Sequence, residues 1–103
     1  MHFEVCRTID ANHPSLPGHF PGSPIAPGVV ILDEVLAALT EWRKDSHVKA
    51  ISAVKFLVPL KPDQPFAIRL AASEQAEGDV AFGCHVEGRV IVEGRLQVRY
   101  GSH

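Results

Sequence analysis

Apolar and polar residues alternate along most of this chain, but one stretch has helical spacing instead. The alternation over residues 2–9 predicts a first strand that is buried on one side. Between Val29 and about Lys44, apolar residues recur every three or four positions, which predicts a helix roughly 22–24 Å long. Four strand-like stretches follow Asp45 and Ser46, separated by turn sequences at 62–65, 77–79 and 87–88.

The predicted helix is apolar through most of its first two turns, and this predicts burial on more than one side. We therefore expect an α+β fold, in which a curled antiparallel sheet of about five strands wraps around one long central helix. We expect residues 1–103 to form a single domain. The apolar stripe of the helix consists of Ile31, Leu32, Val35, Leu39 and Trp42.

The last strand has the clearest alternation, with Ile91 as its one exception. The apolar residues of one parity are Val90, Val92, Leu96, Val98 and Tyr100. Three arginines of the other parity, Arg89, Arg95 and Arg99, predict a solvated face or, less often, a docking surface for an acidic carrier.

Composition narrows the class of protein. A chain of 103 residues with 46% hydrophobic composition can form a core, and a second copy of the chain could complete it. Ten basic against 12 acidic residues give a net charge of −2, so we expect no nucleic-acid partner. We also expect no membrane segment, a cytoplasmic location, and buried or half-buried thiols at Cys6 and Cys84.

Candidate chemistry is concentrated between residues 13 and 33. Five prolines from Pro14 to Pro27 predict a stiff loop that holds His19, whose neutral imidazole is a base near neutral pH. We expect Pro27 to be the first helical residue, and Gly28 to let a ligand approach the free N–H groups of the first turn. Such donors stabilise negative charge that develops on a thioester oxygen when the α-proton is removed.

Asp33 lies inside the predicted helix and could hold or protonate a leaving hydroxyl, so that His19 and Asp33 together could carry out a β-elimination. The alternative for Asp33 is a solvated carboxylate near a helix N-terminus, and periodicity alone does not decide between the two. Glu34 is the rival acid, but it shares its side with Glu41, which favours solvent exposure. His19 could also simply brace the loop, although its glycine, proline and helix-start context favours a catalytic role.

These residues closely resemble the signature of the FabZ/FabA-type 3-hydroxyacyl-(acyl-carrier-protein) dehydratases, which have the hotdog fold. The resemblance is carried by 18–22 (Gly-His-Phe-Pro-Gly), Pro24, 27–29 (Pro-Gly-Val) and 32–33 (Leu-Asp), and more weakly by 56–63. It extends to the small dehydratases of aryl-polyene pathways. Ala37 stands where both branches of the family commonly place a glutamine.

The resemblance implies that His19 is the general base, that Asp33 is the acid or water holder, and that the Gly28 N–H donates to the thioester carbonyl. Phe20, Pro21 and Val29 would be further substrate-binding residues. It also implies a substrate carried on the phosphopantetheine of acyl carrier protein or CoA, with no metal or redox cofactor. The expected assembly is a homodimer, a larger assembly of dimers or a heterodimer with a related subunit, in which each site takes His19 from one subunit and Asp33 from the other.

Two other functions remain open from the sequence. The same fold supports thioester hydrolysis, although hotdog thioesterases usually lack this paired histidine and aspartate. A non-catalytic subunit that binds an acyl carrier or completes a dimer would keep the loop for its backbone shape alone.

Overall fold

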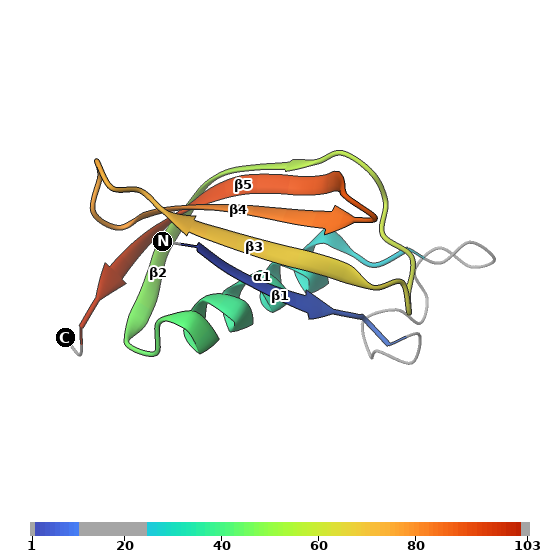
Figure 1. Ribbon diagram of the computed structural model, residues 1–103, viewed down its shortest axis with the longest axis horizontal. Coiled ribbons are helices and arrows are strands. Elements are labelled where there is room, and N and C mark those ends of the chain that lie inside the picture. The colour runs from blue at the N-terminus through green and yellow to red at the C-terminus, as the bar shows by residue number, and fades with distance from the viewer. Residues whose placement is uncertain (1, 11–24, 102–103) are drawn as a thin grey trace.

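The computed structural model describes residues 2–10 and 25–101. In these two ranges, five strands form one antiparallel sheet in the order β1-β3-β4-β5-β2, and one helix lies along one face of it (Figure 1). The elements are β1 (His2–Arg7), α1 (Gly28–Trp42), β2 (Ser46–Phe56), β3 (Phe66–Ala72), β4 (Asp79–Val86) and β5 (Arg89–Tyr100). The predicted arrangement of one strand, one long helix and four further strands is confirmed.

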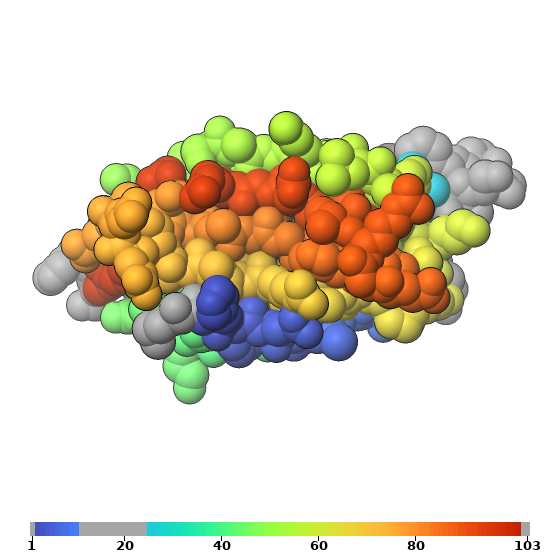
Figure 2. Space-filling model, turned by 45° about the horizontal axis from the view of Figure 1, so that its top comes forward, coloured from blue at the N-terminus to red at the C-terminus, as the bar shows by residue number. Residues whose placement is uncertain are grey.

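The core lies between α1 and the facing side of the sheet. Five helix residues are buried there, namely Val30, Ile31, Val35, Ala38 and Leu39. The alternating apolar residues of β3 and β4 point to the same core, since Phe66, Ile68, Leu70, Val80, Phe82 and Cys84 are all buried. The opposite, outer face is shown in Figure 2, where β1, β3, β4, β5 and β2 lie side by side from blue through yellow and orange to red and green.

The exception at Ile91 is explained by a β-bulge. His85 pairs with Val90 and Cys84 pairs with Val92, so Ile91 is an extra residue on β5. Ile91 and Val92 are both buried because the bulge turns consecutive side chains inward. The preceding hairpin turn uses Glu87 at φ 51° and Gly88 at φ 80°, which is the conformation of a two-residue type I′ loop.

Several predicted boundaries were wrong by a few residues. The first strand ends at Arg7, not at residue 9, although Ile9 is buried. The helix ends at Trp42, not near Lys44, and Pro27 is its N-cap with extended backbone (φ −61°, ψ 145°) instead of its first helical residue. These differences arise at element ends, where the first and last turns of a pattern carry little periodic signal.

The predicted burial of the helix and of Cys6 also needs correction. Leu32 and Trp42 are only half-buried, and one side of α1 is exposed in the single chain, so the helix is not buried all round. Cys84 is fully buried as expected, whereas Cys6 is exposed because it points to the outer face of β1. Burial raises the pKa of the Cys84 thiol to about 12.

Candidate active site

The N-terminus of α1 is held in place by the segments on either side of it. The N–H of Ala26 donates to the carbonyl of buried Leu60 over 2.7 Å, which ties the entry of the helix to the chain that follows β2. The Pro27 carbonyl accepts the N–H groups of Val30 (3.0 Å) and Ile31 (3.3 Å). The N–H groups of Gly28 and Val29 precede these bonds and therefore have no partner within the helix. This end of the helix provides hydrogen-bond donors and the positive end of the helix dipole.

Asp33 lies on the same side of the helix as Val29, one turn further on, and both are exposed. Ala37 and Thr40 continue this exposed stripe, and we call these four residues the open helix face. The helix dipole acts on a carboxylate only within the first turn of a helix. Asp33 is the sixth helical residue and lies beyond that turn. Among the described residues, no hydrogen bond or ion pair occupies the Asp33 carboxylate. A structural role for Asp33 through the dipole or through such a partner therefore has no support in the described part of the chain.

Glu34 has a structural partner, unlike its neighbour. Its Oε1 lies 3.3 Å from Nε of Arg7, and the same guanidinium also binds the Glu41 carboxylate. Arg7 shares its side of β1 with Phe3 and Val5, so this side faces the helix. The two glutamates therefore fasten α1 to β1, which also raises the pKa of Arg7. Glu34 is therefore engaged in an ion pair, whereas Asp33 has no such partner among the described residues.

Phe56 is a residue of this region that the sequence analysis did not select. It is the last residue of β2, and its ring lies against Gly28 at the start of the helix. A Phe-Leu pair after a strand-like stretch was visible in the sequence, but periodicity could not show which of the two side chains would reach the helix. Phe56 is 50% exposed and Val29 is 64% exposed, so two partly exposed apolar side chains lie at this helix terminus.

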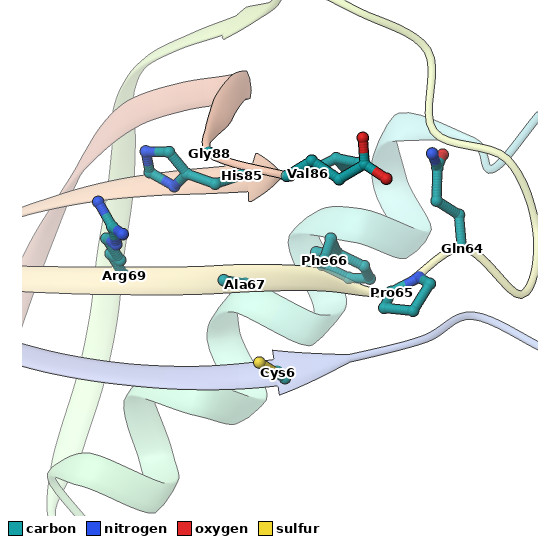
Figure 3. Close-up of a pocket in the computed structure, with 10 residues that line it drawn as sticks. Cys6, Gln64, Pro65, Phe66, Ala67, Arg69, His85, Val86 and Gly88 are labelled. Atoms are coloured by element: carbon teal, nitrogen blue, oxygen red, sulfur yellow. The ribbon is translucent and has the colours of Figure 1, made fainter.

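The outer face of the sheet carries a separate hollow of about 290 Å³ (Figure 3). Cys6, Arg69 and His85 are among its lining residues, and Figure 3 shows them on neighbouring strands on the side away from α1. Of the predicted site residues that the structure describes, Gly28, Val29 and Asp33 do not line it. The predicted residues fall into two groups, because Gly28, Val29 and Asp33 lie together at the helix start, whereas His19, Phe20 and Pro21 lie outside the described residues.

Within the described residues, a curled antiparallel sheet with one helix along its face forms a hotdog-type fold, and the start of that helix, which has no side-chain cap there and an exposed carboxylate nearby, is the candidate active site. The family model of ApeI-like proteins, described as ApeI dehydratase, matches residues 2–95. The chain therefore belongs to the ApeI-like dehydratase family, and the predicted family is confirmed.

Characterised relatives agree with this assignment. The chain is 30% identical to the 3-hydroxyacyl-(acyl-carrier-protein) dehydratase FabZ of Geobacter metallireducens, an alignment that covers 93% of this chain and 72% of the relative. It is 32% identical to FabZ of Chlamydia trachomatis serovar D, over 87% of this chain and 67% of that one. The predicted class of function, dehydration in fatty-acid or specialised acyl biosynthesis, is supported by these relatives.

Solved structures show the shared fold. The dehydratase heterocomplex ApeI:P of Xenorhabdus doucetiae has a chain that superposes with a TM-score of 0.82 at 21% identity, covering 94% of this chain and 86% of that one. The fluoroacetyl-CoA thioesterase FlK superposes with a TM-score of 0.73 at 11% identity, covering 97% and 86%. Because a dehydratase and a thioesterase both have this fold, the fold alone does not choose between the two reactions.

Proposed function

We propose that this protein dehydrates 3-hydroxyacyl thioesters to trans-2-enoyl thioesters. The observation that carries the proposal is the position of Asp33, an exposed carboxylate on the helix face that begins at Gly28 and Val29, whose N–H groups have no partner within the helix. If the thioester carbonyl binds at the start of the helix, the acyl chain can run along the helix and bring its β-carbon towards Asp33. Membership of a dehydratase family points to the same reaction.

The proposed reaction is an elimination across C2 and C3 of the acyl group. His19 takes a proton from C2, and the electron pair passes to the thioester oxygen, where the Gly28 N–H and the helix dipole stabilise the enolate. The enolate then forms the C2–C3 double bond while the C3–O bond breaks. Asp33 holds the leaving hydroxyl and supplies the proton with which it departs as water, and the proton that His19 took from C2 then passes to Asp33, so that both side chains return to their starting states.

The substrate would be carried on the phosphopantetheine of acyl carrier protein or CoA, with Phe20, Pro21 and Val29 beside it. Each step is a proton transfer or an oxyanion stabilisation, so the proposal requires no metal and no redox cofactor. No helix in the described part of the chain has the length and apolar character to span a bilayer. We keep the cytoplasm as the proposed location, where carrier-bound acyl groups are made.

A second subunit is part of the proposal because the described chain leaves apolar surface open beside the site. On β2, the edge strand of the sheet, Val48, Ile51 and Phe56 pair with buried residues of β5 and so point to the same side as the core. They are nevertheless 36%, 39% and 50% exposed. A long edge strand with such a row is suited to pairing with another chain.

We therefore propose that two subunits join through β2, and that each site takes His19 from one subunit and Asp33 from the other. Native mass spectrometry of the purified protein would give the assembly, and Ile51→Lys would place a charge in the apolar row. We expect the wild type to be a dimer and Ile51→Lys to be a monomer. If the wild type dimerises only when it is co-expressed with a related subunit, the assembly is a heterodimer. Loss of turnover should accompany loss of the dimer.

The central experiment mixes the assembled protein with a panel of 3-hydroxyacyl thioesters on carrier protein or on its short pantetheine mimic. Enoyl thioester is followed by ultraviolet absorbance and mass spectrometry, beside a His19→Ala variant. Enoyl product from the wild type alone would support the proposal. Release of free acid would instead favour a thioesterase, and a lack of any product would favour a non-catalytic binding subunit.

A further inference from the structure

The ring of Phe56 covers the first residue of α1. A Cβ atom built on Gly28 would lie 2.7 Å from Cζ, 2.9 Å from Cε1 and 3.3 Å from Cε2 of this ring, which are the nearest atoms outside the helix among the described residues. The tip of the ring is therefore in contact with the Gly28 backbone, and it fills the space into which a side chain at residue 28 would project. A side chain at residue 28 would meet this ring, so the contact gives a local reason for a glycine at this position.

The backbone that carries Phe56 is fixed, although its ring is half exposed. Phe56 pairs with Val92 of β5, and the N–H groups of Leu57 and Val58 both donate to the Ile91 carbonyl, over 2.8 and 3.2 Å. Phe56 is 50% exposed, and the tip of its ring lies against Gly28. Phe56 is therefore a fixed wall of the helix terminus whose contribution depends on the size of its side chain.

We infer that Phe56 is a specificity-determining residue that restricts the site to acyl groups unbranched at C2, an inference that rests on the proposed function. A thioester oxygen that accepts the Gly28 N–H lies about 2.9 Å from that nitrogen. The carbonyl carbon and C2 then lie within a few ångströms of the Gly28 Cα, and the ring already fills the space next to this Cα where a Cβ would be. A methyl branch on C2 meets the ring, whereas a straight chain passes along the open helix face towards Asp33.

The same wall keeps water away from the developing oxyanion. An apolar ring against the helix terminus leaves the backbone N–H groups as the polar partners there and strengthens their interaction with negative charge. Shortening the side chain should therefore lower kcat on the straight-chain substrate and raise acceptance of the branched one. This combination separates a wall in the site from a residue that only supports the fold.

The test compares kcat/KM for 3-hydroxybutyryl and 2-methyl-3-hydroxybutyryl thioesters of pantetheine in the wild type, Phe56→Ala and Phe56→Leu. Leu57→Ala is the matched control, because Leu57 is adjacent, apolar and 52% exposed, and its atoms are not among those nearest to Gly28. An extra methyl group in an apolar pocket changes selectivity by roughly 10–200-fold. Phe56→Ala should therefore shift the branched-to-straight ratio at least about tenfold, with a smaller shift in Phe56→Leu and none in Leu57→Ala.

Each outcome decides a different point. Turnover by the wild type with an unchanged ratio in both Phe56 variants would overturn the inference and leave the proposed function intact. An equal shift in Leu57→Ala would also overturn it, since the effect would then belong to the apolar surface in general. No elimination by the wild type on the straight-chain substrate would overturn the proposed function, and this inference with it. If Phe56→Ala does not fold by circular dichroism, Phe56→Leu carries the comparison.

Discussion

Replacing Asp33 with asparagine removes the carboxylate and keeps the shape of the side chain. Asp33 is exposed, and within the described chain no hydrogen bond or ion pair engages it, so the free energy of unfolding should change by no more than about 0.5 kcal/mol. A positioned acid or base contributes about 10²–10⁴-fold to a rate. The turnover of a 3-hydroxyacyl thioester should fall by that factor, which corresponds to about 3–5 kcal/mol of transition-state stabilisation.

Glu34→Gln is the matched control because it changes the adjacent acid in the same helix. Its carboxylate lies 3.3 Å from Arg7, and the side chains of Arg7 and Glu34 are 21% and 32% exposed. Breaking a pair of this kind costs about 0.2–1 kcal/mol of stability. Glu34→Gln should therefore lose a little stability and keep its turnover, the reverse of Asp33→Asn.

Both variants are assayed for enoyl product by absorbance and for stability by urea denaturation. The assignment of the acid fails if Asp33→Asn retains turnover within a factor of three of the wild type. It also fails if Glu34→Gln loses as much turnover as Asp33→Asn. An unfolded Asp33→Asn protein would show that the exposed carboxylate has a structural role.

Three further predictions concern stability and reactivity. Gly78→Ala should lower the free energy of unfolding more than Gly88→Ala, and urea denaturation compares the two variants. Both glycines have positive φ, but a Cβ at residue 78 would lie 2.4 Å from a carbonyl oxygen of β5, whereas a Cβ at residue 88 would lie in open space. Iodoacetamide at pH 8 should label exposed Cys6 and spare Cys84, whose pKa is raised to about 12, and equal labelling of both by mass spectrometry would contradict the burial of Cys84. The free energy of unfolding should fall above about pH 9, because the thiol of Cys84 ionises there in the unfolded chain but not in the folded one. Leu39→Ala should cost about 2–5 kcal/mol, measured by the same denaturation, and a loss below 1 kcal/mol would contradict its place in the core.

The order of elements could be predicted from the sequence because each has a strong local signal. The alternation of β3 and β4 reports one buried face of a sheet, and the three- and four-residue spacing of α1 reports one buried side of a helix. The turn at residues 87–88 has a local signal as well, because Gly88 adopts a positive φ without steric cost. The family motif reported the fold directly, since it is carried by residues that are contiguous in the chain.

Long-range packing explains what the sequence could not show. The pattern put Glu34 among solvated residues, but only the docking of β1 beside α1 revealed Arg7 as its partner. The bulge at Ile91 depends on how β5 pairs with β4, and a pattern of period two has no signal for an inserted residue. The exposure of Cys6 follows from the outward direction of one side of β1.

The sequence by itself determined the chemical groups of the candidate site, because His19, Gly28 and Asp33 lie in one short segment whose spacing is the family signature. Tertiary structure alone decided that Glu34 pairs with Arg7 and that Phe56, 28 residues after Gly28, covers the start of the helix. It also left the apolar row of β2 uncovered. The physical reason is that helical and strand periods encode which side of an element is buried, whereas the neighbour that buries it is set by strand order and register.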